Sequence, residues 1–153
     1  MTELSRKERE KLQHKIEIME AAERVCARLG YHESSIQDIA AEAELSVGTI
    51  YNYFESKDNL YFSILEMRFE NYTSIVKEEL SKLDSPVEKI KKIVQVKLSE
   101  IEKHKSFFRI LFDYSKEASL KSKVESKGCI RSQYQEHMRS LEQLFREAIE
   151  QGK

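Results

Sequence analysis

Residues 34–60 read SSIQDIAAEAELSVGTIYNYFESKDNL and carry the most informative pattern in the sequence. Its apolar residues recur at helical spacing in two short blocks, 36–43 and 47–54, which are joined by only a few residues. Ser35 and Ser46 stand just before the two blocks, where a serine hydroxyl can cap the first turn of a helix. Two short helices with so tight a connection are typical of a helix-turn-helix, whose second helix lies in the major groove of DNA.

The sequence on both sides of this stretch also predicts helices. Amphipathic patterns cover residues 5–29, 57–83, 86–101 and 119–151. Gly30 follows the last apolar residue of the first pattern, and we expect it to end that helix as an αL C-cap. Ser85 and Pro86 predict an N-cap and a first helical position for the third pattern.

The composition favours an all-α fold. The 153 residues include 4 Gly and 1 Pro, and 35% of them are charged, whereas hairpin turns between strands would need more glycine. We expect a three-helix N-terminal helix-turn-helix domain over residues 1–56, followed by an antiparallel helical bundle over residues 57–153. The helix that begins at Lys57 spans the junction between them.

The charge of the chain is balanced overall and uneven locally. With 26 basic and 27 acidic residues, the net charge of −1 predicts no general attraction to polyanions or membranes. Residues 1–57 hold 8 basic and 11 acidic residues, yet residues 45–54 contain no acid. The basic residues before Ile16 form either an arm that reaches a neighbouring groove of DNA or an ordinary solvated helix end; they are Arg6, Lys7, Arg9, Lys11 and Lys15.

Secretion and membrane insertion find no support in the sequence. Cys26 and Cys129 are too few and too far apart for a disulfide framework, and the N-terminus lacks the apolar segment of a signal peptide. No apolar run is long enough to span a membrane. We therefore expect a cytoplasmic protein with no membrane partner.

An enzyme is equally unsupported. The four histidines are scattered singly along the chain, at His14, His32, His104 and His137. No Cys or His stands at metal-ligand spacing, and the sequence has no Glu-x-x-His pair, no phosphate-binding glycine loop and no nucleophile elbow. We expect no catalytic residue, no metal and no cofactor.

Two overlapping segments resemble a known family. AAERVCARLGYHESSIQDIAAEAELS (21–46) and SVGTIYNYFESKDNLY (46–61) are closely similar to the N-terminal signature of the TetR family of bacterial transcriptional regulators. The similarity covers about residues 16–65. The motif positions in place are Gly30, Tyr31, Ile39, Ala40, Gly48, Thr49, Tyr51, Phe54, Lys57 and Leu60. So long a match is specific, and it implies a DNA-binding regulator.

The resemblance also implies which residues contact DNA. The matching positions here are Ser35, Gln37, Ser46, Val47, Gly48, Thr49, Tyr51, Asn52, Tyr53 and Lys57. Their chemistry agrees, because Gln37 and Asn52 can read base edges and Val47 can contact a thymine methyl. Gly48 lets a backbone approach closely, and the ammonium of Lys57 can bind phosphate.

Several of these residues have a second interpretation. Tyr51 serves as readily in a core as at DNA, and Ser35 and Ser46 are N-caps in either case. Gln37 and Lys57 can be ordinary solvated side chains.

Glu44 departs from the family pattern, which usually has Gly at this turn. A non-Gly residue in the left-handed region costs about 1 kcal/mol. We expect the turn to form with some distortion, and we expect the Glu44 carboxylate either to point away from phosphate or to lower the affinity for DNA.

The second part of the chain resembles the family in architecture alone. In members of that family this region binds an effector and dimerises, but no motif in residues 84–153 of this sequence identifies a ligand. Residues that either line an apolar cavity or belong simply to the core are Met67, Tyr72, Phe107, Phe108, Leu111, Phe112, Tyr134 and Met138.

Together these features predict a homodimeric repressor that a small apolar or amphipathic effector releases from a palindromic operator of double-stranded DNA. The alternative is a helical adaptor that binds other proteins and no specific DNA. Family members usually continue for one or two helices beyond the position of Lys153. We therefore expect either a C-terminally truncated fragment or a shortened member, whose dimer is weak or altered.

Overall fold

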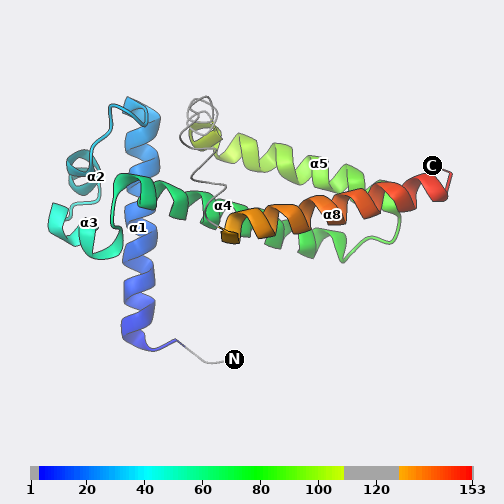
Figure 1. Cartoon of the computed structure of the whole chain (residues 1–153), viewed down its shortest axis with the longest axis horizontal. Coiled ribbons are helices and arrows are strands. Elements are labelled where there is room, and N and C mark those ends of the chain that lie inside the picture. Colours follow the sequence, from blue (N-terminus) through cyan, green and yellow to red (C-terminus); the bar gives the residue numbers. More distant parts are fainter. Residues whose placement is uncertain (1–3, 109–127, 153) are drawn as a thin grey trace. The chain divides into compact units, whose positions relative to one another are not determined.

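The described part of the chain is helical. The computed structural model describes residues 4–108 and 128–152, and no strand occurs among them. Its helices are α1 (Arg6–Leu29), α2 (Ile36–Glu42), α3 (Val47–Tyr53), α4 (Lys57–Leu80), α5 (Pro86–Lys103) and α8 (Gly128–Glu150) (Figure 1). The predicted all-α fold is confirmed.

Serine caps begin the first three helices. Ser5 and Ser35 each form a capping box, in which the serine hydroxyl accepts the N–H of Glu8 or Asp38 and that residue's carboxylate accepts the serine N–H. The Ser46 hydroxyl accepts the N–H of Thr49 at 3.0 Å. These bonds satisfy donors that the first turn of a helix leaves without a helical partner, so the caps expected at Ser35 and Ser46 are confirmed.

Three helix ends differ from the expectation. Gly30 has φ 85° and ψ 162°, so its φ is positive but it is not in the αL region; its N–H donates to the carbonyl of Cys26 at 2.8 Å. Ser85 is the N-cap of α5 without a capping hydrogen bond from its side chain, and the proline that follows presets the first turn instead. Helix α4 ends at Leu80, three residues before the expected end. The chain then continues in a turn in which the Leu83 N–H donates to the Leu80 carbonyl at 3.2 Å.

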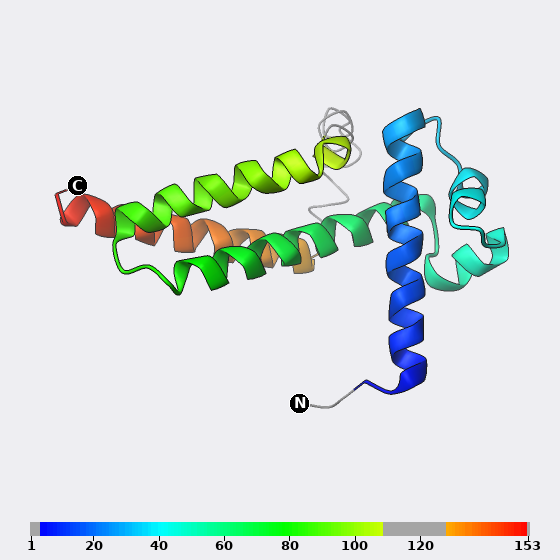
Figure 2. The same cartoon turned by 180° about the vertical axis from the view of Figure 1, so that it is seen from behind.

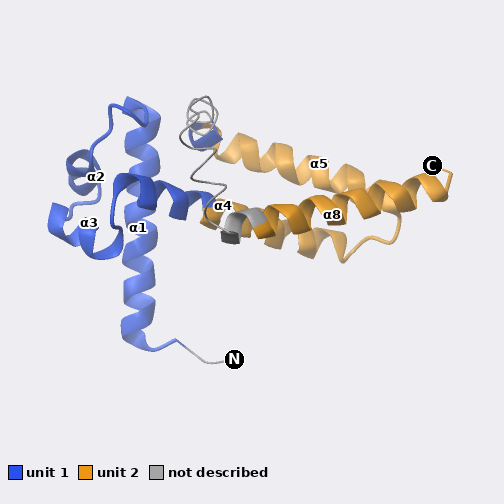
Figure 3. Cartoon of the chain, viewed as in Figure 1, with its two compact units in different colours: residues 1–65, 106–114 blue, residues 66–105, 115–153 orange. Residues whose placement is uncertain are grey.

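The chain divides into two compact units (Figure 3). One comprises residues 1–65 with 106–114, and the other comprises residues 66–105 with 115–153. The first turns of α4 thus group with the N-terminal helices, and the domain boundary at residues 56–57 stays a prediction. The largest fully buried side chains of the first unit are Ile18, Val25, Ile39, Ile50, Phe54, Leu60 and Ile64. This closed core holds the two short helices.

The second unit packs α4, α5 and α8 around a smaller core. Val76 of α4, Ile93 and Val96 of α5, and Leu144 of α8 are buried together. Helix α5 runs antiparallel to α4 and α8, as predicted (Figures 1 and 2). Residues 119–127 of the last predicted helix lie outside the described residues. Within the described ranges, every helix is too short or too polar to cross a membrane.

Candidate nucleic-acid interface

The turn between α2 and α3 brings the two short helices together. Glu44 has φ 55°, the left-handed conformation expected here, and its N–H donates to the carbonyl of Ala41 at 3.2 Å. The N–H of Leu45 donates to the carbonyl of Ala40 at 2.9 Å. These bonds offset a conformational cost of about 1 kcal/mol. The Glu44 side chain is exposed, so its charge remains in solvent.

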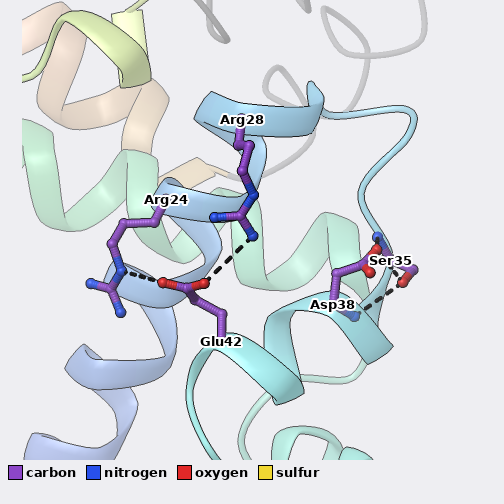
Figure 4. A network of polar contacts seen from close by, with 5 residues as sticks. All are labelled: Arg24, Arg28, Ser35, Asp38 and Glu42. Atoms are coloured by element: carbon purple, nitrogen blue, oxygen red, sulfur yellow. Dashed lines mark hydrogen bonds and ion pairs between the residues drawn. The ribbon is translucent and has the colours of Figure 1, made fainter.

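Ion pairs and a capping box hold α2 at both ends (Figure 4). Glu42 accepts hydrogen bonds from Arg24 Nε at 2.8 Å and from Arg28 Nη2 at 3.5 Å. The bond from Arg24 keeps the pKa of Glu42 below its usual range. At the other end, hydrogen bonds from Ser35 lower the pKa of Asp38. The arginine pairs have no signal in the sequence, since they join residues 18 and 14 positions apart.

The predicted contact residues of α2 and α3 are open to solvent. The exposed residues are Gln37, Ser46, Gly48, Tyr51 and Asn52, while the half-buried ones are Ser35, Val47, Thr49, Tyr53 and Lys57. Tyr51 is 52% exposed, which excludes the alternative that it belongs to the core. Because residues 45–54 contain no acid, α3 presents an uncharged surface that carries polar and aromatic groups.

Gly48 lies within α3 and has no reason inside the described part of the protein to lack a side chain. A Cβ built there would meet nothing closer than Ser46 Oγ at 3.8 Å, an ordinary van der Waals contact. Its φ is not positive. Glycine within a helix is about 1 kcal/mol less favourable than alanine. Neither crowding by the described residues nor backbone conformation therefore accounts for a glycine at this position.

Two of the predicted contact residues also cap the short helices. Ser46 Oγ caps α3 and lies 2.8 Å from Thr49 Oγ1, so the two hydroxyls form one hydrogen-bonded pair. Ser35 caps α2 through Asp38. Contact of any of these groups with DNA stays a prediction.

Tyr53 has a partner on α1 that the sequence did not reveal. Nδ1 of His14 lies 3.3 Å from the Tyr53 hydroxyl, and the two rings meet edge to face with their centroids 6.4 Å apart. The next residue, Lys15, places its ammonium 5.6 Å from the centre of the Phe54 ring. Since 39 positions separate His14 from Tyr53, no spacing rule predicts their contact.

Lys57 is engaged inside the first unit. Its ammonium donates to the carbonyl oxygens of Tyr31 at 2.7 Å and Ser34 at 2.9 Å, and it lies 4.2 Å from the centre of the Tyr31 ring. The Tyr31 hydroxyl in turn donates to the Asp58 carboxylate. Lys57 therefore ties the loop between α1 and α2 to the start of α4, and its predicted contact with phosphate is untested.

An apolar groove of about 310 Å³ lies between the helices of the second unit. Aliphatic and aromatic side chains of α5 and α8 line it, with Tyr72 of α4, and its polar members besides that tyrosine are Lys97 and His137. Burial and the nearby charge of Lys97 lower the pKa of His137. An ammonium beside an apolar lining suits an amphipathic ligand with an anionic end.

The groove gathers few of the predicted pocket residues. Tyr72 lines it, while Met67 is half-buried elsewhere, and Tyr134 and Met138 are 54% and 45% exposed. Phe107 and Phe108, whose ring centroids are 5.4 Å apart, group with the first unit. Leu111 and Phe112 lie outside the described residues. Within residues 4–108 and 128–152, no cluster of His, Cys, Asp and Glu could hold a metal ion.

Comparisons with known proteins agree with this arrangement. Residues 18–64 match the family model for bacterial regulatory proteins, tetR family. The uncharacterized HTH-type transcriptional regulator YuxN of Bacillus subtilis (strain 168) is 33% identical over 143 residues, which cover 91% of this chain and 46% of that protein. The chain thus spans about half the length of this relative.

Solved structures share the fold. The fatty acid degradation regulator FadR from Bacillus halodurans superposes with a TM-score of 0.77 at 21% identity, covering 91% of this chain and 70% of that one. The transcriptional regulator FadR from Bacillus subtilis, solved in complex with stearoyl-CoA, gives a TM-score of 0.75 at 22% identity over 90% and 72% of the two chains. The helix-turn-helix region of the chain, residues 18–64, therefore belongs to the tetR family of bacterial regulatory proteins.

Proposed function

We propose that this chain is a DNA-binding transcriptional regulator, a cytoplasmic repressor that a small apolar or amphipathic effector releases from a palindromic operator. The observation that carries the proposal is Gly48, which lacks a side chain on α3 although the protein itself leaves room for one. Close approach of α3 to the floor of a major groove explains the glycine, and the uncharged helix surface fits hydrogen bonding to base edges.

The exposed amides supply the sequence reading in this proposal. Gln37 on α2 and Asn52 on α3 hydrogen-bond to base edges, and the Tyr53 hydroxyl binds a phosphate beside them. Glu44 stays in solvent. The twofold symmetry of a palindrome requires two copies of the chain.

A second copy also explains the apolar surface of the second unit. Large side chains of α5 and α8 are half exposed or more; they are Val94, Leu98, Tyr134, Phe145 and Ile149. Exposed apolar patches of this kind mark sites of association. Packing of this surface against a partner would form the homodimer and would cover the apolar groove, because Val94, Leu98 and Phe145 also line that groove.

The effector is proposed to occupy the groove that Lys97 and His137 share with apolar side chains. Long-chain acyl compounds are the first candidates, since a solved protein of similar fold is described in complex with stearoyl-CoA. An effector releases DNA only if it binds the DNA-free conformation more tightly than the DNA-bound one.

Selection of bound sequences from random double-stranded DNA, with and without a cellular lipid extract, tests the proposal. We expect one enriched palindrome, bound at least about a thousandfold more tightly than unrelated DNA, and weaker enrichment when the extract is present. If the chain is instead a helical adaptor, we expect only weak DNA binding that is independent of sequence. That outcome would refute the proposal.

A further inference from the structure

The N-terminal half of α1 extends beyond the core of its unit. The helix has 24 residues, but its buried residues begin only at Ile18. Both views show this end of α1 continuing past α3 (Figures 1 and 2). Residues 6–14 are exposed, so this segment contributes little to the core, and its sequence is free to serve another purpose.

Contacts with α3 fix which side of this segment faces the candidate interface. His14 meets Tyr53, and Lys15 meets the ring of Phe54. Lys11 and Lys7 precede His14 by three and seven residues, so they lie on the same side of the helix, one and two turns further out. By the rise of an α-helix, Lys7 lies about 10 Å along the axis from His14.

The charges next to this side leave Lys7 and Lys11 available. Glu10 borders them, and Arg6 Nε neutralises it at 2.9 Å. Glu8 is occupied as the capping partner of Ser5. Among the described residues, neither lysine forms an ion pair, and both are exposed. A stripe of Lys7, Lys11 and His14, with an ammonium group at each of its two outer positions, therefore continues from the end of α3.

We propose that Lys7 and Lys11 bind the sugar-phosphate backbone of DNA that flanks the sequence contacted by α3, and that His14 joins this stripe to the phosphate contact of Tyr53. The inference rests on the proposed function and assigns a second contact region to it. Lysines on flexible stems bind phosphates without reading sequence. The stripe therefore adds affinity and salt dependence, but no discrimination among sequences.

Arg9 provides a matched control for this stripe. It is exposed, it has no ion pair among the described residues, and it lies on the opposite side of α1 from His14. Lys11→Gln and Arg9→Gln remove the same charge from the same helix. The selected operator, extended by one helical turn on each side, serves as the probe.

Each lost phosphate contact should lower the slope of log affinity against log salt concentration by about 0.9. We therefore expect Lys11→Gln, which removes one contact from each copy, to lower the slope by about 1.8 per dimer. The double variant Lys7→Gln/Lys11→Gln should lower it by about 3.6. Arg9→Gln should leave the slope unchanged. The ratio of specific to unrelated DNA affinity should stay the same in all three variants, and trimming the flanking base pairs should abolish the difference from wild type.

Equal slopes for wild type and both lysine variants, or equal losses for Lys11→Gln and Arg9→Gln, would overturn the inference while leaving the proposed function intact. Absence of any enriched sequence with the wild-type protein would instead refute the proposed function. Thermal unfolding of each variant shows whether α1 remains folded.

Discussion

The two units of the molecule expose different kinds of side chain. In the first, Gln37, Gly48 and Asn52 are exposed on helices whose core includes the completely buried Ile50. In the second, Leu98 and Ile149 remain 61% and 73% exposed. A polar surface over a closed core suits a hydrated partner such as DNA, whereas exposed apolar side chains require an apolar cover. The first unit therefore has a closed core of its own, whereas the second would gain stability from the proposed association.

The strongest test of this contrast compares a buried residue of the first unit with a half-exposed apolar residue of the second. Ile50→Ala should lower the free energy of unfolding by about 2–5 kcal/mol, because it leaves a cavity in a closed core. Phe145→Ala, at a side chain that is 50% exposed, should cost the monomer less than about 1 kcal/mol. Urea unfolding at low protein concentration measures both losses, and sedimentation shows whether Phe145→Ala weakens the proposed dimer. Equal losses in the monomer would contradict the contrast.

A smaller effect is expected at the contact between the loop after α1 and the start of α4. Lys57→Met leaves the carbonyls of Tyr31 and Ser34 without their charged donor, which should cost about 1.5–3 kcal/mol. Tyr31→Phe removes only the hydroxyl that donates to Asp58, and should cost less.

The salt dependence of DNA binding separates this role of Lys57 from a phosphate contact. If its ammonium stays on the two carbonyls, Lys57→Met lowers the affinity without changing the salt slope. A slope that falls by about 1.8 per dimer would place the ammonium on phosphate instead.

Gly48→Ala should separate stability from binding. Alanine is the better helix former, so the free energy of unfolding should rise by about 0.5–1 kcal/mol. DNA affinity should fall at least about tenfold, or 1.4 kcal/mol, because the methyl group prevents close approach. Thermal unfolding and gel shifts measure the two effects. A variant that is both more stable and fully active would show that α3 does not approach its partner at this point.

The smallest effect concerns pH. Hydrogen bonds lower the pKa of Asp38 and Glu42 in the folded state, so their stabilisation is complete above the ordinary pKa of each group and is lost as the pH falls through the lowered value. We expect stability to decline below about pH 4. The decline should be smaller in Asp38→Asn/Glu42→Gln than in wild type, whereas Glu20→Gln, an exposed control on α1, should follow wild type. Thermal unfolding at several pH values tests this.

Local sequence signals were enough to predict much of the secondary structure of the first unit. The serine at each N-cap, the acid three residues after Ser35, and the apolar spacing predicted α2 and α3 correctly, because these signals act within one or two turns. The left-handed Glu44 was expected as well, because the family that the sequence resembles usually has Gly at this turn. The precise conformation of Gly30 and the unused hydroxyl of Ser85 were not, because more than one arrangement can end or begin a helix.

The residues that line the apolar groove of the second unit were predicted less well. Tyr72 lies in it, but Tyr134 and Met138 lie at the surface. Apolar residues on α8 form a broad stripe, of which Leu144 and Ala148 are buried while Phe145 and Ile149 are exposed. Helical spacing identifies the stripe but cannot say which edge of it meets α4 and α5.

Sequence patterns were enough to predict the helices of the described residues, the family of the helix-turn-helix region and the uncharged surface of α3. Tertiary structure alone decided that Lys57 binds the carbonyls of the loop after α1, that Arg24 and Arg28 hold Glu42, and that His14 meets Tyr53. The reason is physical. Caps, turns and apolar periodicity arise from interactions between residues a few positions apart, whereas these polar contacts join residues brought together only when the helices pack.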